Sequence, residues 1–161
     1  MNKTIKSLLL LCTMLFTFTG FAQNIEEQKA KDDKILKEYF TKNKIKANKT
    51  PSGLYYVITK KGTGENAKPG QMISMSYFGK FLDGKKFDAN VDENFKNIRP
   101  FSFALGQGQV IAGWDEGVQL LNTGAKATLY LPSVIAYGPG GRGPIPPNSV
   151  LVFDVEVLGI K

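Results

Sequence analysis

The C-terminal run VLVFDVEVLGI, residues 150–160, constrains the fold of this 161-residue chain more than any other segment. Apolar side chains occupy every second position in it, at Leu151, Phe153, Val155 and Val157. Side chains alternate between the two faces of a β-strand, so an apolar residue at every second position places one face in a core. The run therefore predicts a strand with one buried face.

Four more segments have the aromatic and β-branched composition of strands and are separated by turn signals such as Asp83-Gly84. These predicted strands are Gly53–Gly64, Met72–Leu82, Phe101–Leu105 and Lys126–Leu131. Between them only Gly113–Leu121 has helical spacing, with Trp114, Val118 and Leu121 at i, i+4 and i+7. The order predicts an α+β fold, in which an antiparallel sheet is wrapped around or against one short helix.

The first residues are typical of a secretory signal. Lys3 and Lys6 precede an apolar run, Ser7–Phe18, and Gly20-Phe21-Ala22 offers small residues for cleavage. We expect export to the periplasm or the medium, with cleavage near Ala22 and a mature chain that begins at Gln23. An uncleaved membrane anchor is the alternative, but the run is short for about 30 Å of hydrocarbon.

A charged segment with a narrow apolar stripe follows the signal. Asn24 and Glu27 resemble a helix N-cap with its reciprocal acid, which predicts a helix over Ile25–Thr41. The stripe consists of Ile35, Leu36, Tyr39 and Phe40. It could dock on the domain that follows or pair with a second copy, so the oligomeric state stays open.

The rest of this segment and the turn after it complete the predicted organisation. Lysines alternate with acids in EEQKAKDDKILKEY, which indicates a solvated helix face. Turn residues then cluster at Thr50-Pro51-Ser52-Gly53. We therefore expect a signal at 1–22, a helical extension at 23–49 and one folded domain at 50–161.

The composition excludes several kinds of chemistry. The chain has no histidine, and its single cysteine, Cys12, lies in the signal, so the mature chain has no disulfide. These absences exclude Cys–His dyads, histidine acid–base catalysis and the usual zinc sites, and no metal or cofactor is expected. The formal charge of +7 falls to +5 without Lys3 and Lys6. For an exported chain nucleic acid is a poor partner, while weak attraction to an anionic membrane surface stays open.

The order of several short motifs is more specific than any one of them. Tyr77-Phe78-Gly79 is followed by DGKKFD at 83–88, Phe101-Ser102-Phe103, VIAGWDEG at 110–117, Ala136-Tyr137-Gly138 and IPPNSVLVFDVEVL at 145–158. Together, over Gly53–Lys161, they resemble the FK506-binding protein (FKBP) family of peptidyl-prolyl cis-trans isomerases, as an exported bacterial member. The resemblance implies a cleft between helix and sheet that accepts the proline of an unfolded or folding polypeptide, and FK506-like macrolides.

The resemblance also implies the residues of that cleft. Its implied catalytic residues are Tyr77, Phe87, Asp88, Trp114 and Tyr137. Its implied substrate-binding residues are Phe101, Val110, Ile111, Ile145 and Phe153. In this interpretation Trp114 is the floor, and the Ile111 amide and the Tyr137 hydroxyl hold substrate carbonyls. Asp88 orients polar groups, including Tyr77.

Two alternatives stay open. Composition alone makes Phe87, Phe101 and Phe153 as compatible with core packing as with a cleft, and Phe103, Leu129, Leu131 and Val155 are expected to be core. Two loops also differ from those of small family members: ANVDENFKNIR at 89–99 is longer, and GPGGRGPI at 138–145 is shorter. These departures leave open a non-catalytic chaperone or binding module that uses the same cleft.

Overall fold

The computed structural model describes residues 24–161, except 93, 97 and 98. Within them seven strands form one antiparallel sheet, in the order β1-β2-β6-β7-β3-β4 with β5 paired to β3. The strands are β1 Asn48–Lys49, β2 Tyr55–Lys60, β3 Met72–Lys80, β4 Lys86–Ala89, β5 Phe101–Ala104, β6 Lys126–Leu131 and β7 Leu151–Ile160. All five predicted strands are present within their predicted bounds, whereas no sequence pattern predicted β1 and β4.

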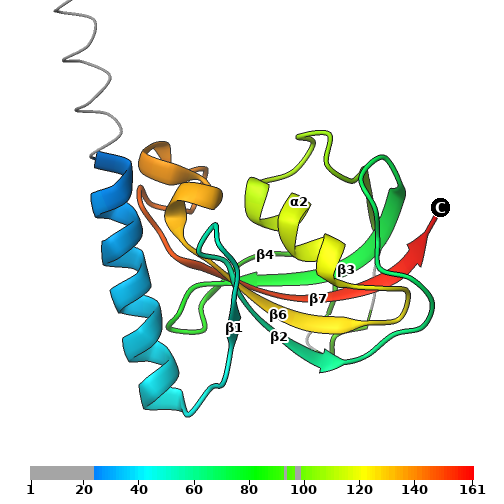
Figure 1. Cartoon of the computed structure of the whole chain (residues 1–161), viewed down its shortest axis with the longest axis horizontal. Coiled ribbons are helices and arrows are strands. Elements are labelled where there is room, and N and C mark those ends of the chain that lie inside the picture. Colours follow the sequence, from blue (N-terminus) through cyan, green and yellow to red (C-terminus); the bar gives the residue numbers. More distant parts are fainter. Residues whose placement is uncertain (1–23, 93, 97–98) are drawn as a thin grey trace, which may run out of the picture.

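Helices lie on both faces of the sheet. A helix over residues 24–43 packs beside β1, and α2, Ala112–Gly117, lies over the opposite face (Figure 1). Single 3₁₀ turns follow α2 and β6: η1 Val118–Leu120, η2 Ser133–Ile135 and η3 Gly138–Gly140. The predicted α+β fold, with a curved antiparallel sheet around one short helix and a further N-terminal helix, is confirmed.

The predicted signal, residues 1–22 with Cys12, lies outside the described residues. In the part of the chain that the structure does describe, no helix has both the length and the apolar character needed to cross a membrane.

The strand at the C-terminus is central, because β7 pairs with both β3 and β6. Its alternating residues Leu151, Phe153, Val155 and Val157 are all buried, as the sequence predicts. The four residues expected in the core are buried as well: Phe103, Leu129, Leu131 and Val155. The inner face of the sheet is therefore a continuous apolar surface against which α2 packs.

Two glycines allow α2 to lie close to β6. A Cβ at Gly113 would lie 2.5 Å from Cδ2 of Leu131, and one at Gly117 would lie 2.8 Å from Cδ1 of Leu129. Either contact is too short for a side chain, so both positions require glycine. Trp114, Val118 and Leu121 form the buried face predicted for this helix, although the segment changes to a 3₁₀ turn at Val118.

The N-terminal helix covers the outer face of the same strands. Leu36 and Phe40 pack on Tyr55, Tyr130 and Val152, and the Phe40 ring centroid lies 4.9 Å from that of Tyr130. The predicted stripe therefore docks on the sheet of its own chain. The other two residues of the stripe contribute less to this contact, because Tyr39 is only half-buried and Ile35 is 44% exposed. Asn24 is already helical, so its predicted role as N-cap is wrong.

A buried carboxylate fixes this helix in place, and it is the one exception to the predicted solvated face, whose other charged residues are exposed or partly exposed. Asp32 is 0% exposed, and its Oδ2 accepts hydrogen bonds from the Ser133 backbone N–H at 2.7 Å and the Ser133 hydroxyl at 2.6 Å. Its Oδ1 accepts from the Gln28 amide at 2.8 Å. Because Asp32, Leu36 and Phe40 are spaced four residues apart, they share the face that contacts the sheet.

The next residue forms a second link, at the edge of the interface. Burial alone would raise the pKa of Asp33, but hydrogen bonds from Lys37, Lys49 and Tyr55 outweigh it and lower that pKa far below its usual value. A lowered carboxyl pKa stabilises the folded state above the unfolded-state pKa of about 4, and this contribution is lost as the pH falls below that value.

We predict that Asp32→Ala lowers the free energy of unfolding by about 2–4 kcal/mol, because two buried donors of Ser133 lose a charged acceptor. Urea denaturation of the purified protein measures this change. Glu38→Ala removes a carboxylate from an exposed position of the same helix and should change the value by less than about 0.5 kcal/mol. Equal effects of the two substitutions would contradict the structural role of Asp32.

Candidate active site

A cavity of about 580 Å³ lies between α2 and the inner face of the sheet. It is lined by Tyr77, Phe87, Asp88, Phe101, Gly108, Gln109, Val110, Ile111, Trp114, Tyr137, Arg142, Gly143, Pro144, Ile145 and Phe153. The structure thus brings together all ten residues that the resemblance implied, although they come from six separate parts of the chain. Their catalytic and binding roles stay predictions.

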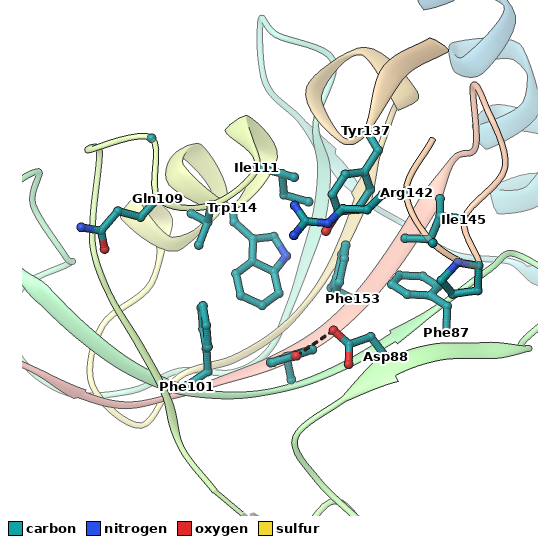
Figure 2. Close-up of a pocket in the computed structure, with 15 residues that line it drawn as sticks. Phe87, Asp88, Phe101, Gln109, Ile111, Trp114, Tyr137, Arg142, Ile145 and Phe153 are labelled. Carbon is teal, nitrogen blue, oxygen red and sulfur yellow. Dashed lines mark hydrogen bonds between the residues drawn. The ribbon is translucent and has the colours of Figure 1, made fainter. Parts of the chain in front are cut away.

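Trp114 forms the floor of the cavity from the first turn of α2 (Figure 2). Its ring meets those of Tyr77 and Phe153 edge-on, with centroid distances of 5.0 and 5.1 Å. It is only 5% exposed and belongs to the core as well as to the cavity. Its indole Nε1 is buried and has no hydrogen-bond partner in the described part of the chain.

The walls are phenylalanines from three strands. The Phe87 ring of β4 packs edge-on against Phe153 of β7, with centroids 5.5 Å apart. Phe101, at the start of β5, stands 6.0 Å from the Trp114 ring centroid and is 37% exposed, which places it at the mouth. Phe87 and Phe153 therefore belong both to the core and to a cavity wall, whereas Phe101 lines the cavity and is not in the core.

A tyrosine and an aspartate supply the ordered polar contact of one wall. The Tyr77 hydroxyl donates to Oδ2 of Asp88 at 2.8 Å (Figure 2). Asn90, directly after β4, holds the end of that strand against β3. Its Oδ1 accepts from the Tyr77 backbone N–H at 2.7 Å, and its Nδ2 donates to the Met75 carbonyl. Burial, the hydrogen bond to Asp88, the negative charge of Asp88 and the nearby Tyr137 raise the pKa of Tyr77 well above its ordinary value.

The edge and the far rim come from two loops. Ile111 has an extended backbone as N-cap of α2, and it lines the edge with Val110. Tyr137 precedes η3, and the chain then turns back through Arg142 to Ile145, which is 7% exposed. The structure thus places the Ile145 side chain in the cavity wall.

Five lining residues were not predicted: Gly108, Gln109, Arg142, Gly143 and Pro144. The sequence could have indicated Gln109, because it directly precedes the predicted binding residues Val110 and Ile111. Its side chain accepts a hydrogen bond from the Ala104 backbone N–H at 2.9 Å. Arg142 lies in a loop that the sequence analysis treated only as a departure from the family pattern. The sequence carries no periodic signal for it.

The arrangement favours binding over bond cleavage. Aromatic rings surround a space that fits a small apolar group, and hydroxyl and amide donors at its rim can hold carbonyl oxygens. Among the residues that the structure describes, no three Asp, Glu, His or Cys side chains are placed together as ligands for a metal ion. The residues of the cavity can therefore orient a bound peptide without forming a covalent bond to it.

Comparison with known proteins gives a family match over most of the folded part. The family model for FKBP-type peptidyl-prolyl cis-trans isomerases matches residues 63–158. The FKBP-type peptidyl-prolyl cis-trans isomerase FkpA of Aeromonas hydrophila is 44% identical over 137 residues, which cover 85% of this chain and 48% of the relative. The chain thus spans about half the length of that relative.

A shorter relative and a solved structure agree with this match. A peptidyl-prolyl cis-trans isomerase of Schizosaccharomyces pombe is 46% identical over 111 residues, which cover 68% of this chain and 96% of the relative. The crystal structure of FkpA from Escherichia coli is similar with a TM-score of 0.68 and 32% identity, covering all of this chain and 74% of that one.

The Tyr77–Asp88 pair predicts a shifted phenol titration. Because the raised pKa favours the neutral phenol in the folded state, the contribution to stability is present below pH 10 and is lost as the pH rises beyond it. We expect Tyr77 to stay protonated at about pH 10.5. Ring ¹³Cζ shifts in an NMR titration measure this directly.

A matched substitution tests the cause of the shift. Asp88→Asn removes the charge and should lower the pKa of Tyr77, while burial keeps it above the ordinary value. Tyr130 lies on the outer face of the sheet, beneath the N-terminal helix, where burial raises its pKa to about 12. This pKa should not change. A Tyr77 that titrates near 10 in the unsubstituted protein would contradict the pairing.

Proposed function

The chain belongs to the FKBP-type peptidyl-prolyl cis-trans isomerase family, and from this premise we propose that its cavity accelerates Xaa-Pro isomerisation in other polypeptides. The single observation that carries the proposal is the gathering of the ten implied residues around one aromatic cavity with Trp114 as its floor. Uncatalysed isomerisation takes tens to hundreds of seconds, slow enough to limit folding. The substrates would be unfolded or folding proteins that contain proline.

The reaction needs no bond cleavage. Resonance in the peptide C–N bond creates a rotation barrier of about 18–20 kcal/mol, and in the twisted transition state this resonance is lost. The planar amide is more polar than the twisted one, so an apolar cavity disfavours the ground state. Each tenfold increase in rate requires about 1.4 kcal/mol of preferential binding to the transition state.

We infer a part for each group that lines the cavity. Trp114 is a flat, dry floor for the proline ring, and Phe87, Phe101 and Phe153 are its walls. Val110 and Ile111 form the edge. The Ile111 amide and the Tyr137 hydroxyl hold substrate carbonyls, and Asp88 fixes the Tyr77 hydroxyl through their 2.8 Å hydrogen bond. These groups orient the peptide and transfer no proton.

A non-catalytic function would use the same cavity to hold apolar segments. The exposed Phe101 at the mouth favours it, because an aromatic side chain in solvent can contact residues beyond the proline. Suppression of the aggregation of a proline-free client, without isomerisation of a peptide, would distinguish this candidate. An FK506-like macrolide is expected to occupy the cavity and to inhibit either function.

We place the activity outside the cytoplasm, in the periplasm or the medium. The basic and apolar pattern of residues 1–22 supports this, as does the similarity to bacterial FkpA proteins. The family match over 63–158 also supports an isomerase domain at 50–161, preceded by a helical extension at 23–49.

Removal of one hydroxyl tests the mechanism. We predict that Tyr137→Phe lowers kcat/KM for a Xaa-Pro peptide about tenfold, because one carbonyl loses its donor in the transition state. Tyr39→Phe, on the N-terminal helix away from the cavity, should leave the rate unchanged. An unsubstituted protein no faster than the spontaneous reaction would disprove the isomerase function, whereas a fully active Tyr137→Phe would disprove only the role of this hydroxyl.

The N-terminus tests the proposed export. Expressed in a bacterium from the complete sequence, the protein should be recovered from the periplasm or the medium with Gln23 as its first residue, because Gly20-Phe21-Ala22 suits a signal peptidase. Intact mass measurement gives the cleavage site. Recovery only of the uncleaved chain, in the cytoplasm or the membrane fraction, would refute the proposal.

A further inference from the structure

One side chain at the cavity, Arg142, has no part in the proposed isomerisation. Arg142 and Ile145 exchange two backbone hydrogen bonds, each of 2.9 Å, across the turn Gly143-Pro144. Residues directly opposite each other in an antiparallel pair project their side chains to the same side. Because Ile145 is buried in the cavity wall, the hairpin directs Arg142 over the same cavity.

The backbone of this hairpin follows a path that favours glycine on both sides of Arg142. Gly141 has φ +63°, and a Cβ there would lie 2.4 Å from the Ile145 carbonyl oxygen. Gly143 has φ +53°, also in the region that favours glycine. The tight turn thus fixes where the arginine side chain starts.

The guanidinium is also held at its far end. Its carbon lies 5.7 Å from the ring centroid of Tyr137, within range of a cation–π interaction. Figure 2 shows the guanidinium beside that ring. Two constraints, at the backbone and at the tip, therefore order this long side chain at the mouth of the cavity.

The charge of Arg142 has no ion-pair partner in the part of the chain that the structure describes. None of the ion pairs among the described residues includes it. Asp88 is the one other charged side chain among the lining residues, and its Oδ2 accepts the Tyr77 hydroxyl. With respect to the described residues, the cavity thus presents an unpaired cation at one rim.

We propose that Arg142 selects substrates with an acidic residue next to the proline, an inference that rests on the proposed isomerase function. A guanidinium offers a planar pair of N–H donors that matches the two oxygens of a carboxylate. A neighbouring residue is one Cα step of about 3.8 Å from the proline, so its side chain lies at the rim when the proline is on Trp114. The apolar walls alone do not distinguish glutamate from glutamine.

The experiment compares matched peptides without tryptophan. They carry Glu or Gln directly before the proline or directly after it, and a further peptide carries Leu before it. Trp114 is the sole tryptophan of the chain and forms the cavity floor, so its fluorescence measures binding independently of turnover. The isomerisation assay gives kcat/KM for the same peptides.

At low ionic strength we expect one of the Glu peptides to bind about threefold to tenfold more tightly than its Gln partner, since Arg142 is exposed. The ratio of the two affinities should fall toward one in about 0.5 M salt, which screens the charges. Arg142→Gln should abolish it, and Arg142→Lys should retain part of it. Lys61→Gln removes an equal charge from an exposed position outside the cavity and should retain all of it.

The results separate the inference from the function on which it rests. Equal binding of Glu and Gln peptides on both sides of the proline, or a Glu preference that persists in Arg142→Gln, would overturn the role of Arg142. Failure to isomerise the Leu peptide would instead refute the proposed function, while fluorescence would still show whether Arg142 recognises a carboxylate.

Discussion

Two adjacent strands, β6 and β7, support the rest of the structure because both of their faces are covered. On the inner face Leu129 lies opposite Phe153, beneath α2 and beside the cavity. On the outer face Tyr130 lies opposite Val152, beneath the N-terminal helix. A slip of one residue in this pairing would exchange the two sets of side chains. The position of the cavity wall and the docking of the helix therefore depend on the same register.

The cavity suits a reaction whose difficulty is conformational. Its residues supply an aromatic floor, apolar walls and a few hydrogen-bond donors, and the chain has no histidine to add to them. Such a site binds one shape of a peptide better than another, which is sufficient for rotation about an amide bond. In the role proposed for Arg142, its charge beside the apolar cavity acts on the residue next to the proline.

The sequence predicted the fold where periodicity was strong and failed where it was weak. β7 and α2 have clear periods, whereas β1 has two residues and β4 has four in a half-exposed pattern, too short for a signal. The site residues were predicted by resemblance, because no local pattern shows that Tyr77 and Trp114 meet. Asp32 was hidden in a charged run, although its spacing to Leu36 and Phe40 could have indicated its burial. The position of Arg142 at the cavity depends on its pairing with Ile145, which only the structure shows.

The docking of the N-terminal helix has a consequence for the order of folding. Its partners Tyr130, Ser133 and Val152 lie about 100 residues later in the chain, so the ribosome makes the helix long before the surface that covers it. Until those strands exist, Leu36 and Phe40 can contact Tyr55 of β2 but neither Tyr130 nor Val152, and the Asp32 carboxylate lacks both donors of Ser133. Closing so long a loop is entropically costly and slow. The helix therefore completes its docking only on a nearly finished chain, and a nascent fragment that stops before β6 leaves part of its apolar stripe uncovered and available to other binding partners.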